Sequence, residues 1–128
     1  MQRRTSAQLA GDAAESLVAD RLAGLGWAIL ARNLRVGRAE LDILAVDPGP
    51  PRELVVVEVR YRASREFGLA EETITHRKRV VLREALSRLR DMGVVSSGQT
   101  VPWLPARFDL VVVEPGSPPR LRRHRHAF

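Results

Sequence analysis

The sequence predicts an α/β protein whose small mixed β-sheet is flanked by helices, in the order helix, three strands, helix, strand. Two segments carry apolar residues at helical spacing, and four shorter runs either alternate or are rich in β-branched residues. Gly and Pro residues separate these segments. Because the chain has only 128 residues, we expect a single domain over residues 5–114, built around one core.

Two helices are predicted. The first spans residues 6–25, where an apolar residue returns every three or four positions and Gly26 follows as a stop. The second spans residues 75–92 and ends at Gly93. The apolar face of the first helix is expected to comprise Leu9, Ala13, Leu17, Val18, Leu22 and Leu25, and that of the second Ile74, Val81, Leu82, Ala85, Leu89 and Met92. The outer face of the second helix is basic and comprises Arg77, Lys78, Arg79, Arg83, Arg88 and Arg90.

Four strands are predicted. The run over 27–36 has the length of a strand, and the run over 39–47 alternates strictly between two faces. After a proline-rich loop, the runs over 53–62 and 107–113 are rich in β-branched residues, which is typical of strands buried on both faces. Residues 115–128 have the Pro, Gly and Ser content and the block of charge that favour a disordered basic tail.

The net charge of +6 favours an anionic partner, and nucleic acid is the first choice. Arg3, Arg4 and four arginines of the tail account for this surplus, so residues 5–114 are neutral. We therefore expect the tail to supply general attraction to DNA. No apolar run approaches the roughly 20 residues that span a bilayer, so we expect a cytoplasmic protein without membrane contact.

The inventory of reactive side chains excludes several kinds of chemistry. Without cysteine the chain has no disulfide, thiolate metal site or thiol nucleophile. Its single lysine, Lys78, does not follow a glycine loop, so a Walker-type phosphate site is absent. The three histidines, His76, His124 and His126, are too scattered for a zinc helix motif or a Ser-His-Asp triad. Catalysis is left to carboxylates, arginines and one lysine.

Acidic residues meet in the hairpin formed by strands 39–47 and 53–62. If its loop is centred on Pro50, Asp42 faces Glu58 and Glu40 faces Arg60. Two facing carboxylates repel each other unless a cation lies between them, and carboxylate oxygens suit magnesium. The pattern therefore predicts a site for a hard cation.

The alternative is a structural ion network, which we weigh about equally. In it, the two acids pair with Arg60, Arg62 or Arg107 instead of a metal ion. Glu15 lies at the rim of the apolar stripe of the first helix and would lean towards the sheet, although a solvated or salt-bridged residue is the default for such a position.

Five blocks occur in one order between about Gly11 and Val113: GDAAESLVADRLAGLGWAILARNLR, GRAELDILAVD, ELVVVEVRYR, a lysine at the head of a helix, and RFDLVVV. They resemble the YraN-like family of small bacterial proteins. That family is similar to the archaeal Holliday junction resolvases and belongs to the restriction-endonuclease-like superfamily. The signature of this superfamily is an Asp, followed after a gap by the motif (Glu or Asp)-x-Lys, in which x is any residue. The resemblance implies a restriction-endonuclease-like sheet.

The resemblance also implies roles for single residues. Asp42 and Glu58 match the metal-binding carboxylates, with the backbone carbonyl of Val59 as a third ligand of Mg²⁺ or Mn²⁺. Glu15 matches an acidic ligand on the first helix, and Arg60 stands in place of the catalytic lysine. Arg60 stays protonated, so it would bind phosphate but not act as a general base. The candidate contacts to DNA phosphates are Lys78, Arg79, Arg83 and Arg62.

Three functions remain open. The first is a metal-dependent DNA endonuclease that hydrolyses phosphodiesters in branched or recombination intermediates, as the resemblance implies, and that acts as a homodimer by analogy with resolvases. The second is a DNA-binding module without catalysis, and the third is a small interaction subunit whose basic tail docks an acidic protein. Trp103, in a loop bounded by prolines, is interpreted as a lid residue or a core plug, and we favour the plug.

Overall fold

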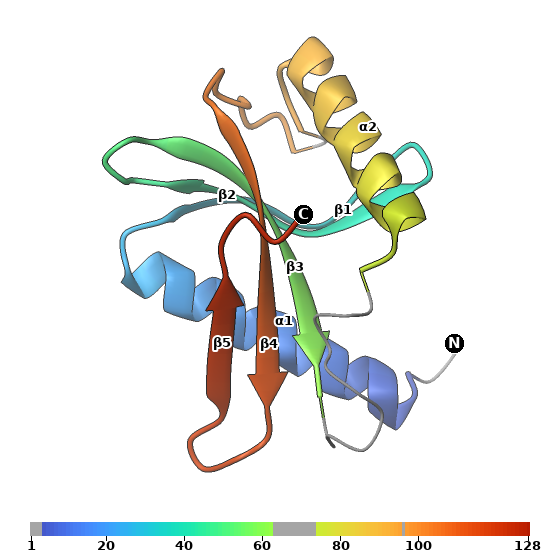
Figure 1. Cartoon of the computed structure of the whole chain (residues 1–128), viewed down its shortest axis with the longest axis vertical. Coiled ribbons are helices and arrows are strands. Elements are labelled where there is room, and N and C mark those ends of the chain that lie inside the picture. Colours follow the sequence, from blue (N-terminus) through green and yellow to red (C-terminus); the bar gives the residue numbers. More distant parts are fainter. Residues whose placement is uncertain (1–3, 63–73, 96) are drawn as a thin grey trace.

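The computed structural model describes residues 4–62, 74–95 and 97–128. Its elements are α1 (Ser6–Gly24), β1 (Ala28–Val36), β2 (Ala39–Asp47), β3 (Glu53–Tyr61), α2 (His76–Met92), β4 (Ala106–Glu114) and β5 (Arg120–His124). The strands form one sheet in the order β1-β2-β3-β4-β5, in which only β3 and β4 run parallel. The predicted α/β fold with a mixed sheet and flanking helices is confirmed, with β5 as an additional strand (Figure 1).

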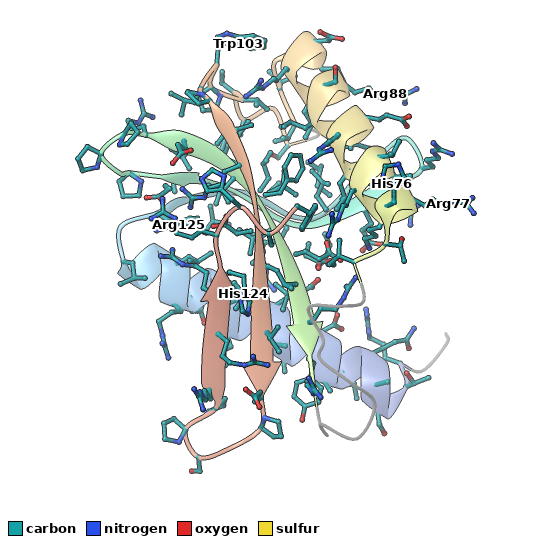
Figure 2. All side chains as sticks on the ribbon, in the orientation of Figure 1. His76, Arg77, Arg88, Trp103, His124 and Arg125 are labelled. Atoms are coloured by element: carbon teal, nitrogen blue, oxygen red, sulfur yellow. The ribbon has the colours of Figure 1, made fainter. Side chains whose placement is uncertain are left out.

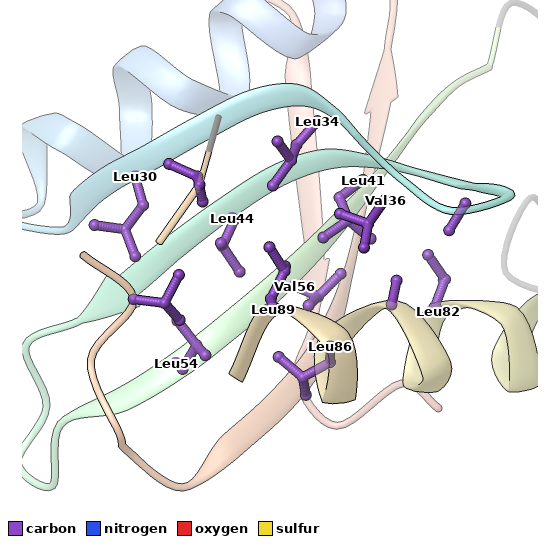
Figure 3. Packing of buried hydrophobic residues seen from close by; sticks show 14 of the residues in the cluster. Leu30, Leu34, Val36, Leu41, Leu44, Leu54, Val56, Leu82, Leu86 and Leu89 are labelled. Carbon is purple, nitrogen blue, oxygen red and sulfur yellow. The ribbon is translucent and has the colours of Figure 1, made fainter. Parts of the chain in front are cut away.

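The two helices cover opposite faces of the sheet (Figure 1). α2, which lies on the connection between the parallel strands, packs Leu82 and Leu89 into a cluster with Val56 of β3 (Figure 3). α1 packs Val18 into a second cluster that contains Val55 of β3. Neighbouring residues of β3 thus serve different faces, as the side-chain alternation of a strand requires.

Capping groups fix the start of each helix. Thr5 and Gln8 form a reciprocal capping box at the start of α1, and the Thr75 hydroxyl accepts from the backbone N–H of Lys78 at the start of α2. Gly93 ends α2 in the left-handed conformation, with φ of 74°. Neither described helix has the length and apolar content to cross a membrane.

The expected apolar face of α1 is partly wrong. Leu9 and Leu25 are exposed, and the face turned to the sheet is built mainly from small residues and one acid. Short alanines at the contact let the helix axis approach the sheet closely, and a pattern based on leucine spacing does not register this. Met92 of α2 is also exposed, whereas Leu86 is buried. The buried residues of α1 are Ala14, Glu15, Val18, Ala19 and Leu22.

The prediction of a disordered tail is wrong for residues 120–124, which form β5 and pair antiparallel with β4. Beyond β5, the N–H of Ala127 donates to the carbonyl of Phe108 at 2.8 Å. The ring of Phe128 lies 5.3 Å from that of Phe108, centroid to centroid. The block of charged residues does not prevent a strand, because arginines can lie on the exposed face of β5 while its backbone hydrogen bonds cover the edge of β4.

Arg107 of β4 is fully buried and joins acidic residues of β2, β3 and β4. Its guanidinium contacts Asp109 at 2.8 Å, Asp47 at 2.9 Å and Glu53 at 2.8 Å. It also lies 5.5 Å from the ring centre of Trp27. Burial lowers the pKa of a guanidinium, but the hydrogen bonds to Asp109 and Asp47 outweigh burial, so the pKa of Arg107 is raised.

Candidate functional site

The site begins where the backbone pairing of β2 with β3 ends. The predicted register is confirmed from Ile43, opposite Val57, to Asp47, opposite Glu53. One residue further, a side chain takes over: the Asp42 carboxylate accepts from the N–H of Val59 at 2.8 Å. Asp42 thus replaces a backbone carbonyl in the ladder, while β3 continues to pair with β4 as far as Tyr61.

A pocket of about 480 Å³ opens at this place. Carboxylates from α1, β2 and β3 line it together with cations from β3 and α2. It therefore brings together Glu15, Asp42, Glu58, Val59, Arg60 and Lys78, six of the residues singled out from the sequence. Its further lining residues are Arg4, Gln8, Gly11, Asp12, Asn33, Glu40 and Tyr61.

Glu58 is the most deeply buried carboxylate of the pocket, at 1% exposure. Its Oε1 receives Nη1 of Arg60 at 2.7 Å and Nζ of Lys78 at 3.0 Å. Its Oε2 is buried and has no hydrogen-bond partner among the described residues. Burial and the charge of Asp42 raise the pKa of Glu58, although the two cations act in the opposite direction.

Asp42 is partly buried, and its pKa is raised to about 6. Burial is the largest cause, and the hydrogen bond from the Val59 N–H opposes it. A hydrogen bond with Glu15 and the charge of Glu15 add to the rise. Asp42 therefore gives up its proton less readily than an exposed aspartate, and a cation bound beside it would favour the charged form.

Glu15 lies on the buried face of α1, at 9% exposure. When the side-chain amide of Asn33 is oriented with its nitrogen towards this carboxylate, it donates to Oε2 at 2.8 Å and to Oε1 at 3.2 Å. Asn33 has a positive φ of 49° within β1, a conformation that asparagine tolerates better than most residues. Asn33 of β1 thus holds the Glu15 carboxylate beside Asp42 of β2.

The residues present fit a magnesium ion through two carboxylates and not through a larger cage. In the described part of the chain, no group of three His, Cys, Asp or Glu side chains is arranged to hold a metal ion. Magnesium needs only one or two protein carboxylates, because it keeps several waters. The N–H and C=O of one residue point to the same side of a strand, so the Val59 carbonyl faces the side on which its N–H meets Asp42. Asp42, the unpartnered Oε2 of Glu58 and this carbonyl would be the ligands.

The remaining predicted contacts to DNA lie outside the pocket. Arg83 is exposed on α2 and stacks at 6.0 Å over the ring of Phe108, and Arg79 is half-buried. Arg62 is buried, at 7% exposure, and its backbone N–H donates to the carbonyl of Val113. Its burial suits an architectural role and not a contact to a phosphate.

Several predicted ion pairs turn out differently. Glu40 is exposed and lies 3.6 Å from Arg35 of β1, its partner across the strands. Arg107 binds the acids at the other end of the sheet, as described above, and Arg60 pairs with Glu58. The alternative of a structural ion network is therefore partly right: Glu58 is paired with two cations, one of which the sequence did not suggest for it.

Two features of the pocket escaped sequence reasoning. Asn33 has no signal other than a polar residue in the middle of an expected strand. Arg4 lies just before α1 and pairs with Asp12 at 2.8 Å on the rim of the pocket. The pairing of β1 with β2 places Asn33 beside Asp42, whereas Arg4 reaches the pocket through the packing of α1 across the sheet.

Comparison with known proteins places the chain among bacterial relatives. The model of the uncharacterised protein family UPF0102 matches residues 14–113. A UPF0102 protein of Symbiobacterium thermophilum is 39% identical over 112 residues, which cover 88% of this chain and 87% of the relative. UPF0102 proteins of Chlorobaculum parvum and Moorella thermoacetica are both 37% identical, over 86% and 88% of this chain and 78% and 83% of their own lengths. The matched range includes Glu15, Asp42, Glu58, Arg60 and Lys78 of the pocket, but not Arg4 and Asp12, and it stops before β5.

Proposed function

We propose that the pocket is the active site of a metal-dependent DNA endonuclease. The chain belongs to the UPF0102 family, and its resemblance to YraN-like proteins is thereby confirmed. One observation carries this proposal. Asp42 and Glu58, two acids whose pKa values are raised, face one pocket with a buried Oε2 that has no hydrogen-bond partner among the described residues. A divalent cation would remove their repulsion and satisfy that oxygen.

Each residue of the pocket would have a separate task. Asp42, Glu58 and the Val59 carbonyl would hold Mg²⁺ or Mn²⁺, which supplies an activated water and polarises a phosphodiester oxygen. Arg60 and Lys78, which both contact Oε1 of Glu58, would bind the phosphate and stabilise the negative charge that develops on it. Glu15, which interacts with Asp42, would orient this ligand and not bind the ion itself, since the residues fit a magnesium ion through two carboxylates.

The substrate that we propose is DNA, with branched or recombination intermediates as the preferred class. The basic residues of α2 would contact the phosphates of a duplex that leaves the pocket. A homodimer would place two such pockets on the two strands of a symmetric junction. Both points rest on the proposed nuclease activity and are tested with it.

The test is cleavage of labelled duplex, flap and four-way-junction DNA with Mg²⁺, with Mn²⁺ and with chelator. We expect metal-dependent products, and Asp42→Asn and Glu58→Gln should reduce their rate by about a hundredfold or more. Glu84→Gln is the matched control, because Glu84 is exposed and pairs only with Arg38 in the described contacts. The proposal fails if no substrate is cut, or if Asp42→Asn cuts as fast as the wild type.

A second function, DNA binding without cleavage, is favoured by the pairing within the pocket. Arg60 and Lys78 already compensate the charge of Glu58 without a metal ion. In that case the affinity for DNA would be the same in chelator and in Mg²⁺ and would fall with rising salt. Unchanged binding of the Asp42→Asn variant, together with an absence of products, would favour this function over the nuclease.

A further inference from the structure

The expectation that Trp103 is buried as a plug of the core is wrong, because 77% of its surface is exposed. It lies in the loop between Val101, which is buried, and the start of β4. Figure 2 shows its side chain at the periphery of the molecule, beside the C-terminal end of α2. The indole is therefore accessible to a binding partner.

Trp103 is held in place by Arg90 of α2. The guanidinium of Arg90 lies 4.8 Å from the centre of the indole ring, and its Nη2 donates to the backbone carbonyl of Leu104. Pro102 and Pro105 flank Trp103 and Leu104 in the sequence and limit the backbone freedom of this loop. The ring is thus oriented before any partner binds, which lowers the entropic cost of binding.

The charge beside Trp103 favours nucleic acid over a second copy of the chain. α2 carries six basic and two acidic residues. Arg79 and Arg83 lie eleven and seven residues before Arg90 and so share its face of the helix. Arg77 and Arg88 extend from another face, away from the body of the molecule (Figure 2). A two-fold contact through this region would bring one basic helix against another, whereas a nucleic acid brings phosphates to the arginines and base faces to the indole.

The position of Trp103 relative to the pocket suits one duplex arm. Lys78 of the pocket lies in the first turn of α2, and Arg90 lies in its last turn. A helix of 17 residues is about 25 Å long, which is roughly the length of seven base pairs. A duplex that follows α2 from the pocket would reach Trp103 where its base pairs end.

We propose that Trp103 and Arg90 form a stacking site for an unpaired DNA base at the end of a duplex arm that lies along α2. This proposal rests on the proposed DNA substrate and specifies its form: a duplex joined to unpaired bases. Bases inside a duplex are covered by their neighbours, so only an unpaired or terminal base offers a free face to the indole.

The test compares binding of two labelled DNA hairpins in chelator, one with a single-stranded overhang and one blunt. Trp103→Ala should weaken binding of the overhang hairpin by about tenfold, as expected for the loss of one base stack, and affect the blunt hairpin much less. Trp103→Phe should restore most of the affinity, because it keeps an aromatic face. Met92→Ala is the matched control for a general apolar contact, since Met92 is exposed at the end of α2.

A second measurement follows the indole itself. The chain has two tryptophans, and Trp27 is buried, so the Trp27→Phe variant leaves Trp103 as the only indole. Its fluorescence should be quenched by the overhang hairpin. The stacking site is refuted if saturating DNA leaves this emission unchanged or if Trp103→Ala binds both hairpins like the wild type. It is also refuted if Met92→Ala weakens binding as much as Trp103→Ala, which would indicate a general apolar contact with the DNA and not a base stack. A wild-type chain that binds neither hairpin would refute the proposed DNA substrate as well.

Discussion

Arg107 is the residue whose replacement should cost the most stability. It is fully buried, and three carboxylates surround its guanidinium. Arg107→Met would leave Asp109 fully buried without its ion-pair partner, so we expect the free energy of unfolding to fall by about 3–5 kcal/mol. Urea unfolding measures this loss.

The control for this substitution is Arg125→Met, which removes an arginine from the same neighbourhood. Arg125 is exposed and lies 3.8 Å from Glu53, a distance and exposure at which an ion pair contributes about 1 kcal/mol or less. Equal losses for the two variants would show that burial of Arg107 is not what makes it important.

Asp42 should make stability fall as the pH rises. Its pKa is raised from 3.8 to about 6 in the folded chain, so between these values the folded chain binds more protons than the unfolded one. The stabilisation is complete at about pH 4 and is lost as the pH rises through 6, with an upper limit of about 3 kcal/mol for this shift. The raised pKa of Glu58 acts in the same direction.

Urea unfolding in chelator, at several pH values between 4 and 7.5, measures this dependence. Asp42→Asn should flatten the profile because its amide does not titrate. Asp20→Asn, an exposed residue of α1, should leave the profile as it is in the wild type. A steep profile that survives Asp42→Asn would assign the pH dependence to other groups.

At the scale of elements, β5 is expected to support the fold and not only to attract DNA. Removal of residues 115–128 would expose the edge of β4 and one face of Phe108. We expect the free energy of unfolding to fall by at least about 2 kcal/mol. This differs from the expectation drawn from the sequence, in which the tail contributes attraction to DNA alone.

The matched variant is Arg120→Ser, which removes one exposed charge of β5 and keeps the strand. It should leave the urea midpoint nearly unchanged and lower only the salt-dependent part of the affinity for DNA. If the truncated chain is as stable as the wild type, β5 is dispensable and the tail acts only through its charge.

The elements that the sequence predicts well are those whose own pattern decides their structure. The alternation over β2 and the β-branched run over β3 predicted both strands within a residue, and the proline-rich loop predicted their register. β5 was missed because its stability comes from pairing with β4, a partner that no local pattern reveals. The face of α1 was partly missed because Ala14, Glu15 and Ala19 share its contact with the sheet with Val18 and Leu22, while Leu9 and Leu25 take no part.

The whole molecule should respond to a metal ion that binds the pocket. Mg²⁺ at about ten times its dissociation constant would add about 1.4 kcal/mol to the stability, which corresponds to a rise of about 3–5 °C in Tm. The rise in Tm should be larger at pH 7.5 than at pH 5.5. The pKa values of Asp42 and Glu58 are raised, so protons compete with Mg²⁺ for these carboxylates at the lower pH.

Thermal unfolding with and without Mg²⁺ measures this effect independently of any activity. Asp42→Asn should abolish the rise in Tm, and Glu84→Gln should keep it. An undiminished rise in the Asp42→Asn variant would locate metal binding elsewhere on the chain.

The candidate site could be predicted from the sequence only in part, for reasons of distance along the chain. Asp42 and Glu58 lie on neighbouring strands, so register alone suggested that they meet. Lys78 reaches Glu58 only because the connection after β3 returns α2 over the sheet, and Asn33 reaches Glu15 only because α1 crosses β1. Such contacts depend on how the elements pack, which a local pattern does not encode.

The contact between Asp42 and Val59 gives the pocket a reporter in the main chain. Here the amide proton of Val59 is held by a side chain of β2 instead of by a backbone carbonyl of that strand. Its NMR resonance and its rate of exchange with solvent therefore follow the protonation of Asp42 and any ion that draws the carboxylate away. A single backbone signal would then register both the acidity and the occupancy of the pocket, without substrate or substitution.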